Sequence, residues 1–171
     1  MGDVEGSAGP GARVGIVGRD EVLARVLAVP IGVATVIVAA PGAGASTLLD
    51  AIAAHLASGG GDVARVQGID VAAPPCSAIA HLLRWPVPTG DDAVRAAADD
   101  LAGEPGGRRV VVVDDADRLD PTSSAVIRAV AAGGRARIVA AGGPGVAAGW
   151  VRAERIDLEP LAPSALERLV E

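Results

Sequence analysis

Short apolar runs alternate with longer amphipathic segments along the chain. The runs at residues 33–40 and 110–113 consist mostly of valine, isoleucine and alanine, and they predict strands buried on both faces of a sheet. The second run belongs to a strand segment, residues 108–120, that ends abruptly in acidic residues. Three further strands are predicted at residues 62–69, 135–143 and 154–161.

The segments between these runs have the apolar spacing and the end signals of helices. One helix is expected to end at the glycines 59–61, and another begins with Pro121 and ends in glycines, the usual asymmetry of helix termini. Asp20 is expected to lie near the cap of the first helix, and Thr89 or Asp91 near the start of a later one. Helices are predicted at residues 20–29, 46–58, 74–88 (short and bracketed by prolines), 89–103, 121–134 and 162–171.

This alternation predicts an α/β protein with helices on both faces of a mostly parallel sheet, a three-layer α/β/α arrangement. The chain has 171 residues, which suits one domain, and we assign that domain to residues 14–171. Residues 1–13 are rich in glycine and alanine and are expected to form a disordered leader.

The stretch APGAGASTLL, residues 40–49, resembles a phosphate-binding loop between a buried strand and a helix. The usual pattern is G-x-x-x-x-G-K-[ST]; here Gly44 and Ser46 are in register, Ala39 replaces the first glycine and Ala45 replaces the lysine. Backbone N–H groups and the helix N-terminus can still hold phosphate without a lysine. The residues predicted to contact a nucleotide here are Pro41, Gly42, Ala43, Gly44, Ala45, Ser46 and Thr47, with the Ser46 hydroxyl as a Mg²⁺ ligand.

A second candidate motif, VVVVDDAD, places Asp114 and Asp115 at the carboxyl end of a buried strand. Ligand sites of open parallel sheets lie at this edge. Asp114 is expected to hold Mg²⁺, largely through water, and Asp115 to orient or deprotonate an attacking water as the catalytic residue. The alternative interpretation, a solvated acidic turn that caps the next helix, fits Asp117 and Asp120 better than Asp114.

Composition and charge narrow the function classes. The net charge is −6, from 15 basic and 21 acidic residues without a basic run, so direct contact with nucleic acid is not expected. Cys76 is the single cysteine, which excludes an intramolecular disulfide. The sequence shows neither a signal peptide nor an apolar run long enough to span a bilayer, so we expect a cytoplasmic protein without membrane contact.

Several segments together resemble the nucleotide-binding domain of signal-transduction ATPases with numerous domains (STAND), which is AAA-like. The closest resemblance is to large ATP-binding LuxR-type transcriptional regulators. It covers roughly residues 14–171 and rests on VGRDEVL, VIVAAPGAGASTLLDAIA, PPCSAIAHLLRW, VVVVDDADRLDPTSSAVIRAV and ERIDLEPLAPSALERLV. The resemblance implies a sheet ordered 5-1-4-3-2, a bound ATP or ADP with Mg²⁺, and a switch that controls assembly with itself or with partner regulatory domains.

The resemblance also implies that Val17, Gly18 and Arg19 lie near the nucleoside. The chain departs from the family pattern at Ala39 and Ala45, and it has no arginine directly after the fourth strand, where the family has a γ-phosphate sensor. The C-terminal helical lid and the DNA-binding helix-turn-helix are absent from this sequence. We therefore expect weak nucleotide binding and weak or absent hydrolysis.

The sequence leaves two alternatives open. The chain can be a nucleotide-free pseudo-ATPase that acts as a protein-interaction scaffold, or an ordinary ATPase whose lysine was substituted. The two histidines are unclustered and no metal site is expected from them: His55 is placed in the last turn of its helix and His81 is expected to be a partly buried helix residue. Cys76 is not expected to be a nucleophile, and Trp85 and Trp150 are expected to be packing residues.

Overall fold

A computed structural model describes residues 18–84, 89–90 and 92–161 of the chain. Its centre is a five-stranded sheet in the order β2-β3-β4-β1-β5, and all four strand pairs are parallel. Read from the other edge, this is the order 5-1-4-3-2, which confirms the expected fold. The strands are β1 (Ala34–Ala39), β2 (Asp62–Gln67), β3 (Arg109–Asp114), β4 (Arg137–Gly142) and β5 (Ala153–Leu158).

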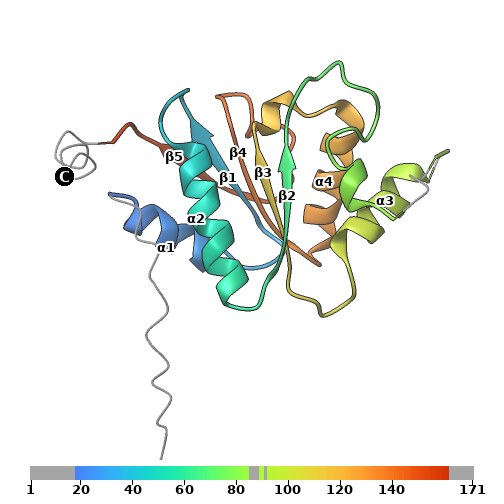
Figure 1. Ribbon diagram of the computed structural model, residues 1–171, viewed down its shortest axis with the longest axis horizontal. Helices are drawn as coiled ribbons and strands as arrows, with labels where there is room; N and C mark the ends of the chain where they lie inside the picture. The colour runs from blue at the N-terminus through green and yellow to red at the C-terminus, as the bar shows by residue number, and fades with distance from the viewer. Residues whose placement is uncertain (1–17, 85–88, 91, 162–171) are drawn as a thin grey trace, which may run out of the picture.

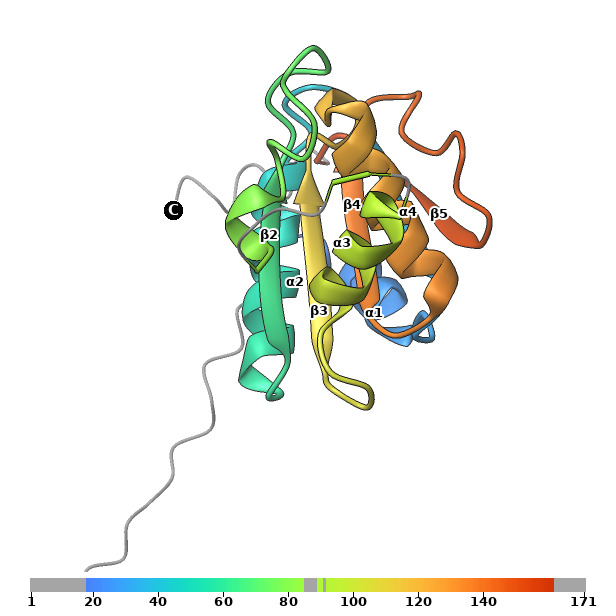
Figure 2. The same cartoon turned by 90° about the vertical axis from the view of Figure 1, so that its right-hand side faces the viewer.

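Helices cover both faces of the sheet and complete three layers. Figure 1 shows α1 and α2 on one side of the strands and α3 and α4 on the other, and the turned view of Figure 2 agrees. The predicted leader (residues 1–13) and the predicted last helix (residues 162–171) lie outside the described residues. The helices are α1 (Asp20–Ala28), α2 (Ala45–Ser58), α3 (Ala93–Ala102) and α4 (Pro121–Gly133), with two short 3₁₀ helices, η1 (Ala80–Leu82) and η2 (Ala116–Arg118).

Small aliphatic residues form two cores, one on each face of the sheet. Along β3 the side chains alternate, so that Val111 and Val113 pack toward α3 and α4 while Val110 and Val112 pack toward α2. Strand β1 is buried along its whole length. Because both faces are covered, the central strands are continuous apolar runs, which is why the sequence predicts them so clearly.

The predicted helix at residues 74–88 is wrong for the part that the structure describes. Residues 74–84 contain turns and only the single 3₁₀ turn η1. Cys76 has a left-handed backbone (φ 63°), and the N–H groups of Cys76 and Ala78 donate to the Asp120 carboxylate. The segment is therefore anchored by a distant side chain instead of by helical hydrogen bonds.

The helix starts differ in detail from the sequence prediction. Asp20 lies inside the first turn of α1, whose cap residue is Arg19, and α3 is preceded by Asp92. Neither cap side chain makes a capping hydrogen bond. In contrast, Asp120 accepts the N–H of Ser123 at the start of α4, with Pro121 in the first turn as predicted.

The parallel sheet gathers the turns after the strands at one edge. The turns that follow β1, β3 and β4 begin at Ala40, Asp115 and Gly143 and lie at the carboxyl edge of the sheet, at the top of Figure 1. This is the edge where open α/β sheets bind their ligands. Within the part of the chain that the structure describes, no helix has the length and apolar character needed to cross a membrane.

Candidate functional site

The turn between β1 and α2 has the backbone of an anion-binding loop. Gly42 and Gly44 adopt left-handed conformations, with φ of 81° and 85°, and a tight turn joins the Ala43 N–H to the Ala40 carbonyl at 3.1 Å. A Cβ on either glycine would meet no atom within 4 Å, so backbone conformation and not space requires glycine here. No side chain caps the N-terminus of α2. Its first N–H groups are therefore available to an anionic ligand.

The local backbone and packing accommodate both alanines that depart from the loop pattern. Ala39 is the buried last residue of β1 and does not have a positive φ, so an alanine is tolerated there. Ala45 is the first residue of α2, is half-buried and packs against the core on the α1–α2 face. Its short side chain brings no charge to the loop. Ser46 and Thr47, the next two residues, are exposed in the first turn of the helix.

Arg19 is hydrogen-bonded to the backbone of the loop between β1 and α2. Its side chain is buried, and the guanidinium donates to the Ala43 carbonyl at 2.8 Å and to the Glu159 carbonyl at 2.6 Å. Arg19 therefore links α1, the loop between β1 and α2, and the end of β5. Among the residues expected near a nucleoside, Gly18 is exposed and Val17 lies outside the described residues.

Ser46 and Asp114 line the same cavity at the carboxyl edge of the sheet. This cavity has a volume of about 370 Å³ and lies between α2, the strands β2 and β3, and η1. Asp114 ends β3, where it pairs in register with Gln67 of β2, and its Oδ1 accepts the N–H of Asp115 at 3.0 Å. The structure thus places both residues that the sequence assigns to a metal ion at the same cavity. The lining residues are Ser46, Leu49, Asp50, Arg65, Val66, Gln67, His81, Val112 and Asp114.

Asp115, in contrast, does not line this cavity. It has a left-handed backbone (φ 47°, ψ 47°), a conformation that aspartate tolerates better than most residues. Its carboxylate accepts a hydrogen bond from Gln67 Nε2 at 2.8 Å. A base that activates water needs access to the reacting atoms. The hydrogen bond from Gln67 engages one of the two carboxylate oxygens, Oδ2, and orients the Asp115 side chain toward β2.

The turn after β3 is locked to both neighbouring strands. The Gly68 N–H donates to the Asp114 carbonyl, and a Cβ on Gly68 would lie 1.9 Å from the Asp115 carbonyl oxygen, which only glycine can avoid. On the other side, Asp117 Oδ1 accepts the Gly143 N–H at 3.0 Å. The turns that follow β2, β3 and β4 are therefore joined by hydrogen bonds into one unit.

The sequence pattern did not identify Gln67, Gly68 and Asp117, which belong to the turns at the site. The position of Gln67–Gly68 at the end of a predicted strand was the available signal, because parallel strands place their carboxyl ends together. The arginine nearest after β4, Arg152, directly precedes β5 and so lies at the opposite edge of the sheet. It cannot act as a phosphate sensor from that position.

The donor groups in the cavity fit Mg²⁺ better than a transition metal. Mg²⁺ prefers oxygen ligands and keeps several waters, so one hydroxyl and one carboxylate suffice beside phosphate oxygens. Ser46 and Asp114 are such a pair, and they share one cavity. The described residues contain no cluster of three or more His, Cys, Asp or Glu side chains that could form a protein-only metal site.

The structure also describes His55, His81, Cys76 and Trp150, side chains for which the sequence predicts no chemical role. His55 is exposed in the last turn of α2, and His81 is exposed in η1, which corrects the expectation that it is partly buried. Burial raises the pKa of the Cys76 thiol, and the nearby Asp120 carboxylate raises it further. The thiolate, the nucleophilic form, is therefore disfavoured at Cys76. Trp150 donates to the Val146 carbonyl at 2.8 Å and packs against the core, as expected of a packing residue.

Comparisons with known proteins support the fold. No protein-family model matches the sequence, and no curated protein matches it. Solved structures do match: the Pif1 helicase from Candida albicans with a TM-score of 0.56 and 18% identity over 89% of this chain, and Drosophila ORC, in its complex with AT-rich DNA and Cdc6, with a TM-score of 0.53 and 12% identity over 78%. This chain covers 41% of the helicase chain and 52% of the ORC chain.

The topology and these neighbours together define the fold class. The chain has a P-loop NTPase-like α/β fold, with a five-stranded parallel sheet and a glycine-rich loop between its first strand and the following helix.

Proposed function

We propose that this chain is an ATP- or ADP-binding regulatory domain with a degenerate Walker A loop. The observation that carries the proposal is one arrangement: a left-handed glycine loop opens an uncapped helix, and the Ser46 hydroxyl of that helix lines a cavity together with Asp114. The loop amides would hold the phosphates, and Ser46 and Asp114 would hold Mg²⁺, largely through water. Bound Mg²⁺ would supply positive charge at the phosphate oxygens.

The same geometry supports weak or absent hydrolysis. Transfer of a phosphoryl group needs positive charge at the γ-phosphate and a positioned water. Ala45 provides no charge, and Asp115, our proposed catalytic residue, is hydrogen-bonded to Gln67. We therefore propose a nucleotide-dependent switch, belonging to a cytoplasmic STAND-type regulator of the LuxR group, in which residues 14–171 form the nucleotide-binding domain.

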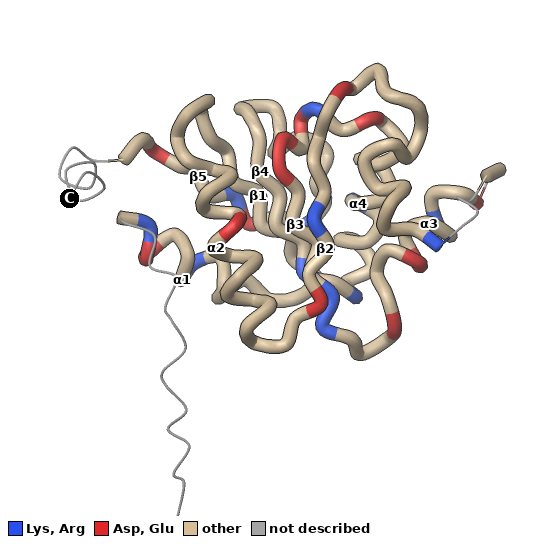
Figure 3. Tube along the Cα trace, in the orientation of Figure 1, with Lys and Arg blue, Asp and Glu red and all other residues tan. Residues whose placement is uncertain are grey.

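The proposed partners are protein chains: further copies of this chain or the regulatory domains of a longer protein. The two structural neighbours are a helicase and an ORC in complex with AT-rich DNA and Cdc6. In this chain, however, acidic and basic positions alternate along the described trace, as Figure 3 shows, and the net charge is −6. This charge distribution argues against direct nucleic-acid contact by these residues.

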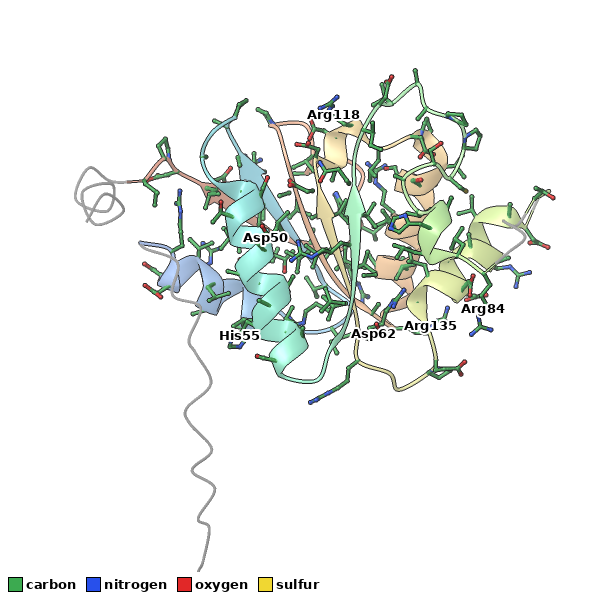
Figure 4. All side chains as sticks on the ribbon, viewed as in Figure 1. Asp50, His55, Asp62, Arg84, Arg118 and Arg135 are labelled. Atoms are coloured by element: carbon green, nitrogen blue, oxygen red, sulfur yellow. The ribbon has the colours of Figure 1, made fainter. Side chains whose placement is uncertain are left out.

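The proposal is tested by calorimetric titration of the chain with ATP and ADP in the presence of Mg²⁺. We expect micromolar binding that Asp114→Ala weakens at least tenfold, because the metal loses its carboxylate. Asp62→Ala is the matched control, since Asp62 is an exposed carboxylate at the amino end of β2, the opposite edge of the sheet (Figure 4). Equal losses in both variants, or no binding by the chain and by Ala45→Lys, would contradict the proposal.

A second candidate function, a nucleotide-free interaction scaffold, is favoured by one observation. Two carboxylates, Asp50 and Asp114, line the cavity, while the loop itself contributes no cation. A polyphosphate would meet this negative charge at close range. Absence of heat in every titration, with a fully folded protein, would favour the scaffold.

A further inference from the structure

A positive charge that can take the place of the one missing at Ala45 lies on strand β2, which contacts α2. Arg65 lies on β2 and lines the same cavity as Ser46 and Asp114. It is two residues before Gln67, so both side chains project from the same face of the sheet. Arg65 is the one lysine or arginine among the lining residues that the structure describes.

An acidic residue of α2 holds Arg65. The Arg65 guanidinium forms an ion pair with the Asp50 carboxylate, and both side chains are more than half exposed. Asp50 follows Ser46 by four residues, so it lies one turn further along the same face of α2, with roughly 5–6 Å between the two Cβ atoms. Figure 4 shows Asp50 on the side of α2 that faces the strands. Arg65 is therefore held about one helical turn away from the predicted phosphate loop.

We propose that Arg65 supplies the phosphate-binding charge that Ala45 lacks, and that Asp50 competes with the phosphates for it. This inference rests on the proposed nucleotide-binding function and names the residue that makes such binding possible without a loop lysine.

Two physical arguments support this role. An exposed Arg–Asp pair contributes little to stability, so it exchanges readily for a better partner. Polyphosphate carries more negative charge than one carboxylate, and the guanidinium matches phosphate oxygens with two parallel hydrogen bonds.

The experiment measures the affinity for Mg·ATP by calorimetry in four proteins: the unaltered chain, Arg65→Ala, Asp50→Asn and the double variant. We expect Arg65→Ala to weaken binding at least tenfold. Asp50→Asn is expected to strengthen binding severalfold, because the competitor loses its charge. In the double variant the gain from Asp50→Asn should disappear, since it acts only through Arg65. With AMP in place of ATP, the Arg65→Ala effect should fall below threefold.

Arg155 and Asp157 provide a matched control pair. They form an exposed ion pair on β5 with nearly the same side-chain exposure, 55% and 63% against 55% and 65% for Arg65 and Asp50, but they do not line the cavity. Arg155→Ala and Asp157→Asn should leave the affinity unchanged. Comparable thermal stability of all variants, checked by circular dichroism, would show that losses of binding do not come from unfolding.

The results separate the inference from the function on which it rests. If the unaltered chain binds Mg·ATP and Asp114→Ala loses binding while Arg65→Ala does not, the nucleotide site stands and the role of Arg65 is overturned. A gain from Asp50→Asn that persists in the double variant would also overturn it. If neither the unaltered chain nor Ala45→Lys binds, both the site and the role of Arg65 are rejected.

Discussion

Ala45→Lys is expected to strengthen Mg·ATP binding by about ten- to a hundredfold. A charge-assisted hydrogen bond contributes about 1.5–3 kcal/mol, which corresponds to that range. Ala45 is half-buried at the first position of α2, directly before the proposed Mg²⁺ ligand Ser46. A lysine stem can extend from this position toward the loop while its charge reaches the β- and γ-phosphates. Isothermal titration of both proteins measures the effect.

Two control variants distinguish the effect of the lysine charge on affinity from the effects of side-chain size and of position. Ala45→Met adds length without charge, and Ala54→Lys adds a charge on an exposed position of the same helix, about two and a half turns further on. Neither should improve affinity more than about twofold. The lysine at position 45 should also lower stability slightly, by about 0.3–1 kcal/mol, because a cation at a helix N-terminus opposes the helix dipole. An affinity gain equal in Ala45→Met would contradict the electrostatic explanation.

Hydrolysis provides a further distinction between the hypotheses. If Gln67 restrains Asp115 as the 2.8 Å hydrogen bond indicates, Ala45→Lys should bind tightly and still turn over slowly. Phosphate release by Ala45→Lys at rates of about 1 s⁻¹ or more, which is the lower end of typical enzymes, would instead favour an ordinary ATPase whose lysine was replaced.

Much of the fold could be predicted from the sequence because the buried strands and the helix ends have strong local signals. The valines of β3 are buried on both faces and form a continuous run, and α4 begins at Pro121 and ends at glycine, as expected. The proposed ligand-binding edge followed from the same reasoning, since parallel strands align their carboxyl ends.

The parts that could not be predicted depend on contacts between distant residues. The hydrogen bonds of Arg19 are one example: its guanidinium donates to the backbone carbonyls of Ala43 and Glu159, 24 and 140 residues away in the sequence. The apolar pattern of residues 74–84 suits a helix, yet the Asp120 carboxylate takes two of its N–H groups. Local propensity is a weak guide where a distant side chain offers the backbone another partner.

Asp120→Ala is expected to lower the free energy of unfolding by about 3 kcal/mol or more. The carboxylate is 1% exposed and accepts four hydrogen bonds: from the N–H groups of Cys76, Ala78 and Ser123, and from the Ser123 hydroxyl. The substitution removes a helix cap, worth about 0.5–2 kcal/mol, and leaves buried donors without a partner at about 1–3 kcal/mol each. Chemical denaturation followed by circular dichroism measures the loss.

Asp92→Ala is the natural control for this prediction. Asp92 also precedes a helix, α3, but it makes no capping hydrogen bond and its side chain is 79% exposed. Its removal should change stability by less than about 0.5 kcal/mol. Losses of similar size at both positions would show that the hydrogen bonds of Asp120 do not stabilise the fold as we argue.

The contribution of Asp120 should also depend on pH in a defined direction. Burial by itself raises the pKa of this carboxyl, but the hydrogen bonds from Ser123, Ala78 and Cys76 outweigh burial and lower the pKa below its usual value. The folded chain therefore holds the charged form to lower pH than the unfolded chain does. The resulting stability is present above the unfolded pKa of about 3.9 and is lost as the pH falls through the folded pKa.

Asp120→Asn tests this dependence, because the amide keeps the size of the side chain without a titrating group. The stability difference between the unaltered chain and Asp120→Asn should be largest near pH 6 and should shrink below about pH 4. The same substitution should loosen the segment that carries His81 over the cavity, because Cys76 and Ala78 tie that segment to α4. Faster amide hydrogen exchange at residues 76–82 in Asp120→Asn, with unchanged exchange in β1, would show that the buried carboxylate shapes one wall of the proposed nucleotide site. A pH-independent difference would reject the charged state as the source of that stability.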